Sequence, residues 1–524
     1  MGKRRSESEV ERSIPAEVEL RLAGEPEVLK AIFASPHLAP QSEADEKLAD
    51  LESRYFDTPN LDLRASGLAF RVRANGRGYR QTLKAGDDSK AAILKRGEWE
   101  TKLDDWHPQP EALPKGARGQ LPKAAFDDEL REAFATRVRR RTRKVSIPGE
   151  GLIEAALDLG EIETGDASLP IAEIELELLE GQPEVLYDLA LKIQDVGPLW
   201  LETRSKSTRA FDQLADRPPD WHRATNPPLG REDSVDEAMV AIFENCFAQW
   251  LANQAAAIDG RDAEGVHQMR VALRRLRSAL SVFRKMVPPE QLEWLQAGAK
   301  GAIGALGPAR DWDVFQADLL APVIEARPDD RELEALRQRA AARVRAGYRR
   351  ARKHLESPDY TRFVLRFGHW LERRDWRHGD DGRRAALLGQ PITDFAGQLL
   401  AKRYKQVLAR GQHFARLATE QRHELRIALK KLRYSIEFFK PLFDKKAVKA
   451  VHGRVKALQE DLGHLNDVAV AEDLVADLLA RPGKRDIRKA AGLVRGWHAR
   501  GVADVEPKLR QDWTMFRAAA PFWQ

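Results

Sequence analysis

Alternation of charged and apolar residues dominates the first 210 residues and constrains the fold more than any other feature. In the stretch AEVELRLAG, residues 16–24, the apolar side chains Val18, Leu20 and Leu22 alternate with charged ones. Such a period of two indicates a β-strand with one apolar face. The same pattern recurs in segments that we expect to pair into an antiparallel sheet with a few intervening helices: LAFRVRA, YRQTLKA, GEWETKL, RVRRRTRKVSI, LIEAALDL and IAEIELELLE.

The charged positions of these strands carry both signs, grouped in blocks. One such strand alone would normally face solvent. Because seven segments repeat the pattern, and their apolar sides must pack against other elements, we expect the charged sides to converge on an enclosed, hydrated interior. The side chains expected there are Glu17, Glu19, Arg21, Arg71, Arg73, Lys84, Glu98, Glu100, Arg139, Arg141, Asp158, Glu173, Glu175 and Glu177.

An interior with both signs of charge suits a site for phosphate and metal. Guanidinium and ammonium groups bind phosphate oxygens, arginine through its planar fork. Carboxylates bind hard divalent cations, most naturally Mg²⁺ or Mn²⁺. Together they suit hydrolysis of a phosphoanhydride bond, because the cations neutralise the transferring phosphoryl group while a carboxylate orients or deprotonates water.

Six segments resemble the CYTH, or triphosphate tunnel metalloenzyme, family over residues 15–212: EVELRL, RYFDTPNLDLRASGLAFRVR, QTLK, GEWE, EIELEL and RSKSTRAF. The resemblance implies an eight-stranded antiparallel tunnel that hydrolyses triphosphates with a divalent metal. Arg21 replaces the lysine of the family signature, which bears on efficiency or substrate preference. No sequence feature selects a purine or thiamine ring, so inorganic triphosphate is the expected substrate. Thiamine triphosphatase and adenylate cyclase activities are the alternatives.

The resemblance also implies roles for individual residues. The expected catalytic residues are Glu17, Glu19, Arg21, Glu98, Glu100 and Asp158. The expected substrate-binding residues are Arg71, Arg73, Lys84, Arg139, Arg141 and Lys206. The expected ligands for Mg²⁺ or Mn²⁺ are Glu17, Glu19, Glu173 and Glu175. The assignment on RVRRRTRK stays open, because basic residues occupy both faces of that strand.

Composition changes near residue 216. The segment DRPPDWHRATNPPLGREDS, residues 216–234, contains two proline pairs and is typical of a linker. Residues 1–218 hold 33 basic and 41 acidic residues, whereas residues 219–524 hold 54 and 40. The basic balance of the second part points to a polyanionic partner. We expect an α+β chain with a charged tail at 1–14, a sheet domain at 15–215, a linker at 216–231 and an all-α domain at 232–524.

The helical part contains an internal repeat. VHQMRVALRRLRSALSVF, residues 266–283, aligns without gaps on RHELRIALKKLRYSIEFF, residues 422–439. LGPARDWDV from Leu306 aligns on LGHLNDVAV from Leu462 with the same offset of 156 residues. Two separate matches at one offset indicate a duplication. We expect two antiparallel helical bundles, at about 235–385 and 391–524.

Each repeat carries a basic stripe, because residues three, four and seven apart share one helix face. The two expected polyphosphate-binding stripes are His267, Arg270, Arg274 and Arg277, and His423, Arg426, Lys430 and Arg433. They resemble the CHAD domain over about 232–520, which implies binding of inorganic polyphosphate, with Asp311 and Asp467 orienting arginines. The stripes lack interleaved aromatic residues, which argues against nucleic acid as the partner.

The remaining features bound the class of protein. Cys246 is the single cysteine, which excludes an intramolecular disulfide and a thiolate metal cluster. No apolar run reaches 18 residues, and the charged N-terminus MGKRRSESEVERS does not match a secretory signal. We therefore expect a cytoplasmic protein without a membrane partner, associated with polyphosphate granules, and leave its oligomeric state open. The opposing hypothesis is a non-catalytic polyphosphate-binding or regulatory protein, in which Arg21 has weakened the tunnel.

Overall fold

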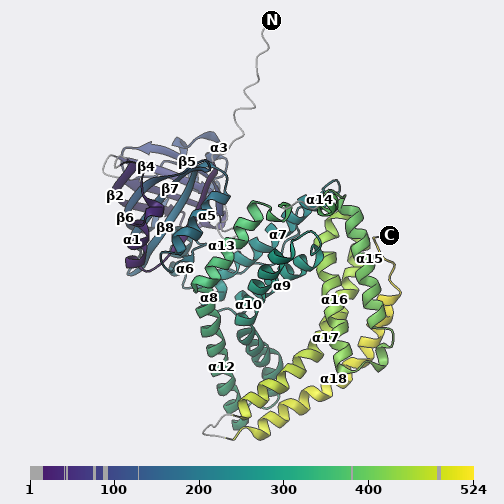
Figure 1. Cartoon of the computed structure of the whole chain (residues 1–524). Helices are drawn as coiled ribbons and strands as arrows, with labels where there is room; N and C mark the ends of the chain where they lie inside the picture. The colour runs from purple at the N-terminus through teal and green to yellow at the C-terminus, as the bar shows by residue number, and fades with distance from the viewer. Residues whose placement is uncertain are drawn as a thin grey trace. The chain divides into compact units, whose positions relative to one another are not determined.

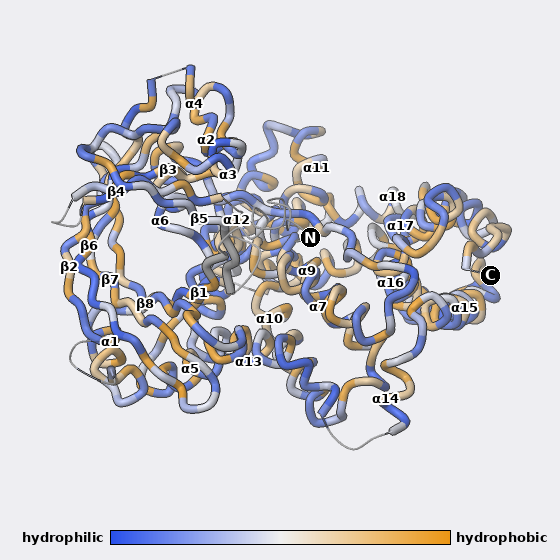
Figure 2. The backbone as a smooth tube through the Cα atoms, turned by 90° about the horizontal axis from the view of Figure 1, so that it is seen from above, coloured by the Kyte–Doolittle hydropathy of each residue, from blue (hydrophilic) through white to orange (hydrophobic). Residues whose placement is uncertain are grey.

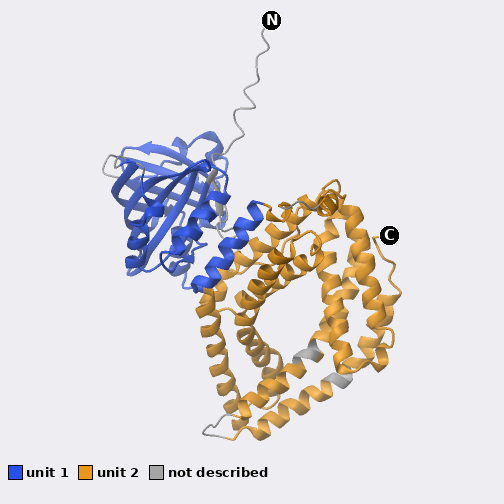
Figure 3. Ribbon diagram, viewed as in Figure 1, with its two compact units in different colours: residues 1–219, 356–373 blue, residues 220–355, 374–524 orange. Residues whose placement is uncertain are grey.

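The structure is a computed structural model that describes residues 16–40, 42, 45–74, 78–85, 93–127, 129–378, 382–480 and 486–523. Within these ranges, the side chains of residues 16–17, 93–96, 464, 466–467 and 502–504 are not described. The chain forms two compact units, shown in Figure 3. The sheet unit comprises residues 1–219 and 356–373, and the helical unit comprises residues 220–355 and 374–524.

The strands of the sheet unit close into a ring (Figures 1 and 2). Strand β5 pairs with both β4 and β1, which completes a circuit of eight strands, and the short β9 adds to β1. The expected antiparallel closed sheet is confirmed, with β9 as a ninth strand in the described residues. The strands are β1 Ala16–Ala23, β2 Glu46–Asp57, β3 Leu68–Ala74, β4 Tyr79–Ala85, β5 Ile93–Leu103, β6 Arg131–Ile147, β7 Gly151–Thr164, β8 Ala167–Gly181 and β9 Trp200–Leu201.

The apolar side of the ring faces outward, where helices cover it. Leu20 and Leu22 of β1 are fully buried, and Phe70 and Leu83 pack in a cluster with Leu63 of α2. Helix α1 packs on β7 and β8, and α5 packs on β1 and β8. The charged side is therefore the inner one. The short helices of this unit are α1 Pro26–Phe33, α2 Asp62–Ala65, α3 Lys115–Arg118, α4 Ala124–Asp127, α5 Glu184–Gln194 and α6 Lys206–Leu214.

Apolar side chains fill one end of the ring. Tyr55 of β2 stacks on Phe134 of β6 with ring centroids 4.4 Å apart, and Phe134 meets Phe211 of α6 edge-on at 5.2 Å. Ile162 of β7 and Ile171 of β8 join the same cluster. Because α6 contributes Phe211 to this cluster, the helix closes the interior at that end.

The helical unit shows the duplication in its helix boundaries. Helices α7, α9, α10 and α12 begin at residues 235, 263, 289 and 331, and α15, α16, α17 and α18 begin at 392, 419, 445 and 488. Corresponding starts are thus 156 or 157 residues apart, as the repeat in the sequence predicts. The helices are α7 Val235–Ala252, α8 Gln254–Asp259, α9 Ala263–Val282, α10 Pro289–Val314, α11 Ala321–Ala326, α12 Arg331–Leu355, α14 Gly382–Leu388, α15 Ile392–Arg410, α16 Thr419–Phe439, α17 Lys445–Leu479 and α18 Arg488–Arg517.

The two repeats meet inside the helical unit. Helix α9 packs against α16. A separate buried cluster joins the first repeat to α17 and α18 through Phe315, Leu336, Val475 and Val494. The basic stripes expected on α9 and α16 therefore lie on helices in direct contact. No helix in the described ranges has both the length and the apolar character needed to cross a membrane.

Helix α13, Pro358–Glu372, belongs to the sheet unit although it follows the first helical repeat in sequence. It packs along α5. Gln194 Nε2 donates to the carbonyl oxygen of Pro358 at 2.7 Å, and His369 Nε2 lies 3.1 Å from Asp188 Oδ1. The sequence predicts this segment to lie within the repeat at 235–385, because its apolar periodicity does not indicate which partner its buried face meets.

Candidate functional site in the closed sheet

The interior of the ring collects ionisable side chains of both signs. Glu19 and Arg21 on β1 are 5% and 2% exposed, and Asp158 on β7 and Glu173 on β8 are fully buried. The register explains why they share a face, because Asp158 lies opposite Glu173 and Arg21 lies opposite Glu175. Of the three glutamates expected in the interior from β8, Glu173 is the most buried.

Three carboxylates form a compact group in the described part of the chain. Asp158, Glu173 and Glu175 each offer an oxygen within 4.8 Å of the others. Arg140 donates from Nε and Nη2 to the two oxygens of Asp158, at 2.7 and 2.6 Å, and also pairs with Glu175 Oε2. Lys206, at the start of α6, points its ammonium into the group.

The charges of this group hold one another ionised. Burial raises the pKa of Asp158, but Lys206 and Arg140 outweigh it and hold the pKa below its ordinary value. The same balance holds the pKa of Glu175 well below its ordinary value. Burial lowers the pKa of Lys206, whereas the three carboxylates raise it by more. Asp158 and Glu175 are therefore ionised and Lys206 is protonated at neutral pH.

A second group in the interior is basic. Arg73 Nε donates to Ser53 Oγ at 3.0 Å, and burial, followed by the charges of Arg71 and Arg140, lowers the pKa of Arg73 to about 9. Burial raises the pKa of Tyr55, but the charges of Arg71, Arg73 and Lys206 reverse this and lower it overall. Buried guanidinium groups that repel one another favour an anion between them.

The basic group continues with Lys84 on β4, which pairs with Glu98 on β5. Lys84 Nζ lies 3.0 Å from Glu98 Oε2, and Arg71 Nη2 lies 3.4 Å from Glu98 Oε1. Glu100 is more exposed than Glu98 and pairs with Arg80 at 3.0 Å. Glu98 is thus an interior carboxylate, whereas Glu100 is held by a half-exposed arginine.

The donor set of the carboxylate group fits a hard divalent cation. Asp158, Glu173 and Glu175 provide oxygen ligands only, which Mg²⁺ and Mn²⁺ prefer. Glu173 Oε1 is buried and accepts no hydrogen bond; its neighbour is the ammonium of Lys206. Glu19, an expected ligand, lies 3.5 Å from Arg21 Nε and outside this group. The side chain of Glu17 falls outside the described residues.

Arg139 and Arg141 lie on the outer face of β6, not in the interior as expected. Arg139 is 71% exposed at its side chain and lies 3.4 Å from Asp50, while Arg141 pairs with Glu46. Both border a groove of about 860 Å³ on the outside of the ring, with Lys30 of α1. Arg140 points inward instead, since it shares its face with Phe134 and Val138 of the inner cluster.

Four interior residues are not among those expected from the sequence: Tyr55, Arg140, Arg209 and Ser53. Arg140 lies in the stretch RVRRRTRK, where basic residues occupy both faces of the strand. The apolar residues Phe134 and Val138 have the same parity as Arg140 and indicate the inward face. Arg209 Nη2 donates to Glu173 Oε2 at 2.9 Å, and it lies on the same helix face as Lys206, three residues away. Tyr55 and Ser53 are uncharged, so the alternation of charged residues along the strands does not include them.

The basic stripe on α9 is partly buried. Arg270 is 7% exposed, and its Nε and Nη1 atoms are buried without a hydrogen-bond partner. Burial, then the charge of Arg274, lowers the pKa of Arg270 to about 10, and Asp311 lies 3.7 Å away. Burial and the charge of Arg310 lower the pKa of His267. Arg277 is exposed.

The stripe on α16 differs from its duplicate. Arg433 Nε donates to Gln459 at 2.7 Å and Nη1 to Glu437 at 2.9 Å. His423 is exposed, and Arg426 and Lys430 are half-buried. Asp467, expected to orient an arginine, has a side chain outside the described residues. The two stripes are therefore related in sequence but unequal in their local partners.

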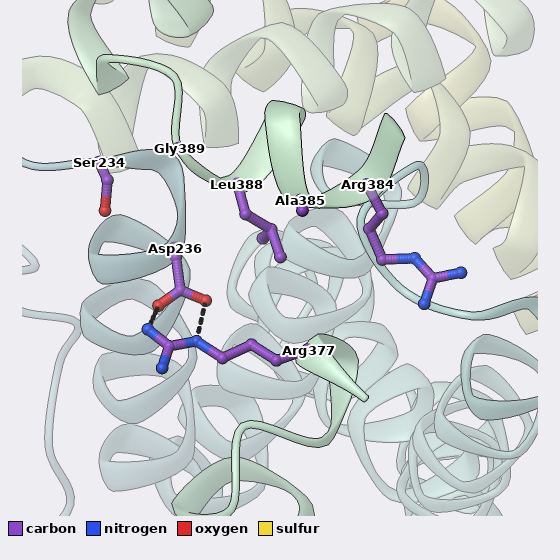
Figure 4. Close-up of a pocket in the computed structure, with 7 residues that line it drawn as sticks. All are labelled: Ser234, Asp236, Arg377, Arg384, Ala385, Leu388 and Gly389. Carbon is purple, nitrogen blue, oxygen red and sulfur yellow. Dashed lines mark hydrogen bonds and ion pairs between the residues drawn. The ribbon is translucent and has the colours of Figure 1, made fainter. Parts of the chain in front are cut away.

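A cavity of about 340 Å³ lies elsewhere in the helical unit, and none of the expected site residues borders it (Figure 4). Asp236 at its wall accepts from Arg377 Nε at 3.0 Å and from Trp376 Nε1 at 2.7 Å. Arg374 also pairs with Asp236. These contacts tie the start of α7 to the segment after α13, which is a structural role.

Comparisons with known proteins match both units. The model described as CYTH domain matches residues 16–211, and the model described as CHAD domain matches residues 241–476. An uncharacterised protein of Mycobacterium tuberculosis is 25% identical over 462 residues, 82% of each chain. A Haemophilus influenzae protein named inorganic triphosphatase is 26% identical over 197 residues, 37% of this chain and 54% of that protein. The CHAD domain crystal structure from Ricinus communis is 31% identical with a TM-score of 0.50, covering 57% of this chain and 98% of that chain.

Proposed function

The chain belongs to the proteins in which a CYTH domain is followed by a CHAD domain, and from this premise we propose that the closed sheet hydrolyses inorganic triphosphate. The observation that carries the proposal is the pairing, in one interior, of a buried carboxylate group with buried arginines. Arg71 and Arg73 would bind phosphate oxygens, and Arg140 would hold the carboxylates of Asp158 and Glu175 in place. The similarity to the Haemophilus influenzae inorganic triphosphatase supports this substrate.

The interior residues divide the chemistry between them. Asp158, Glu173 and Glu175 would hold Mg²⁺ or Mn²⁺. That cation would neutralise developing charge on the phosphoryl oxygens when bound. Arg71 and Lys84 both contact Glu98 and would turn to phosphate when substrate enters. Glu98 would then have an oxygen available to orient the attacking water.

The closed end favours a short substrate. The cluster of Tyr55, Phe134 and Phe211 fills the interior on the α6 side. A long polyphosphate could not thread through such a site and would insert only its end. The rings of this cluster already pack on one another, so they offer no exposed aromatic face to a thiamine or adenine ring. Thiamine triphosphatase and adenylate cyclase activities therefore remain the second choice.

Neighbouring arginines on β6 provide a matched test of the site. Arg140→Gln should lower kcat/KM for triphosphate by about 100-fold, because it removes an inward guanidinium from a buried charged site. Arg139→Gln, one residue away on the outer face, should remain within about twofold of the wild type. The assay is phosphate release from triphosphate with Mg²⁺ or Mn²⁺. Equal losses in both variants, or no phosphate release by the wild type, would contradict the proposal.

The helical unit supports a second proposal, the binding of inorganic polyphosphate by the stripes on α9 and α16. The two helices are in contact, and Arg270 presents buried guanidinium atoms without hydrogen-bond partners. A repeated phosphate chain would supply the missing acceptors. Binding in this way would raise the local concentration of phosphate chains near the protein and would place it on polyphosphate granules in the cytoplasm.

Polyphosphate and DNA should be compared at matched salt by fluorescence anisotropy on the full chain. Arg274→Gln with Arg277→Gln should weaken polyphosphate binding by about tenfold or more, since two of the phosphate contacts are lost. Arg349→Gln with Arg350→Gln removes the same charge from an exposed part of α12 and serves as the control. Equal weakening by both pairs would indicate attraction by net charge alone.

The regulatory alternative predicts polyphosphate binding without hydrolysis. It draws on Arg21, whose Nη1 donates to the carbonyl oxygen of Arg204 at 2.6 Å and so fastens the segment that leads into α6. An arginine used in this way is less available to phosphate than the lysine of the family signature. Metal-dependent phosphate release by the wild type that is lost in Asp158→Asn would support the triphosphatase and contradict the regulatory alternative.

A further inference from the structure

The ammonium of Lys206 occupies the centre of the carboxylate group. It lies 2.9 Å from Asp158 Oδ2 and 2.7 Å from Glu175 Oε1, and it also contacts Glu173 Oε1. The ammonium donates a hydrogen bond to Glu175 Oε1 and makes ion pairs with the other two oxygens. Lys206 therefore holds the place that a cation with three carboxylate ligands would take.

The remaining oxygens of the group are held by arginines. Arg140 binds both oxygens of Asp158 and Oε2 of Glu175, and Arg209 binds Oε2 of Glu173. The oxygens that face Lys206 are thus the ones not committed to a guanidinium, except for the shared Asp158 Oδ2. A divalent cation and the ammonium would need the same oxygens, and two positive centres cannot share them without strong repulsion.

We propose that Lys206 is a built-in counter-ion of the metal site, which neutralises the carboxylates until a divalent cation displaces its ammonium. The inference rests on the proposed function in taking Asp158, Glu173 and Glu175 as the metal ligands. It adds that metal affinity is set by competition with a side chain of the chain itself. Lys206 is mobile enough for this role, because its ammonium ends a flexible four-carbon stem, unlike the rigid fork of Arg140.

Displacement gives Lys206 a second task. An ammonium expelled from the carboxylates remains within the basic interior, where phosphate oxygens of the substrate would accept its hydrogen bonds. Substrate would thereby stabilise the displaced position of Lys206 and strengthen cation binding. By reciprocity, the cation would strengthen substrate binding by the same factor.

The test measures Mn²⁺ binding alone, by electron paramagnetic resonance of the free ion, on the full chain without substrate. Lys206→Met should bind Mn²⁺ about tenfold more tightly than the wild type, a change of about 1.4 kcal/mol. Lys206→Arg keeps the charge and should not gain affinity. Lys84→Met, which removes an interior ammonium that pairs with Glu98 instead, is the matched control and should stay within about twofold.

Loss of the Lys206 ammonium from three clustered carboxylates could impair folding, so circular dichroism should accompany each measurement. Lys206→Gln, whose amide still donates two hydrogen bonds, replaces Lys206→Met if the latter does not fold. Equal or weaker Mn²⁺ binding by the folded Met or Gln variant overturns the inference. Phosphate release by the wild type is measured separately, so that loss of the triphosphatase proposal and loss of this inference give different results.

Discussion

Packing of α13 against α5 can be tested with a single methyl group. A Cβ atom at Gly368 of α13 would lie 2.4 Å from ring atoms of Tyr187 in α5, far inside van der Waals contact. Overpacking of this kind costs about 1–3 kcal/mol of unfolding free energy. Replacing a mid-helix glycine by alanine also contributes about 0.5–1 kcal/mol of helix propensity. Gly368→Ala should therefore lower the stability of the sheet unit by about 1 kcal/mol net.

Gly304 of α10 supplies a matched control. It is an exposed, mid-helix glycine, and a Cβ there would meet no atom within 4 Å. Gly304→Ala should raise stability by about 0.5–1 kcal/mol, because the propensity gain acts alone. The propensity contribution is common to both variants, so the difference between them, about 1–3 kcal/mol, isolates the contact between Gly368 and Tyr187.

Urea unfolding of the full chain, followed by tryptophan fluorescence and circular dichroism, measures both variants. Two compact units can unfold in separate transitions, so each transition is fitted by itself. The glycines lie in different units, and each change should appear in one transition only. Stabilisation by Gly368→Ala equal to that by Gly304→Ala would show that α13 does not pack closely on α5.

Three further predictions concern charge, metal and the cysteine. The pKa of Asp158 is depressed in the folded state, so its contribution to the free energy of unfolding is fully present above the ordinary pKa of 3.8 and is lost as pH falls below that value. In urea unfolding experiments, the difference in stability between the wild type and Asp158→Asn should therefore shrink below pH 3.8. Removal of metal with EDTA should abolish phosphate release but shift the melting temperature by no more than about 1 °C, because Lys206 and Arg140 already neutralise the carboxylates; a large shift would indicate a structural metal. Burial raises the pKa of the Cys246 thiol to about 11, so a thiol reagent at pH 8 should react with it at the rate at which the helical unit unfolds.

The closed sheet could be predicted from sequence because its alternation is strict and its two faces differ in kind. Leu20 and Leu22 mark the covered outer face, and Glu19 and Arg21 mark the inner one. Among the side chains that the structure describes, the alternation gave the wrong face on β6, where basic residues stand on both faces and charge does not distinguish them. There the decisive residues were the apolar ones, because Val138 must join the inner cluster.

The site was less predictable than the fold for reasons that are specific to its residues. Tyr55 and Ser53 act through uncharged groups, and Arg209 emerges only when α6 is seen to lie against Glu173. The stripes on α9 and α16 are equivalent in sequence, yet Arg433 donates hydrogen bonds to Glu437 and Gln459. The repeat pattern does not predict these partners. Periodicity fixes the face on which a side chain lies, whereas its partner depends on packing between distant segments.

The course of the chain between its units has a consequence for biosynthesis. It leaves the sheet unit after residue 219, returns at 356 to add α13, and leaves again after 373. A ribosome must therefore translate helices α7 to α12 before it synthesises α13, the last part of the sheet unit. Until then, the face of α5 that packs against α13 is uncovered. A gene fragment that ends at the proline-rich linker therefore encodes the sheet unit without α13.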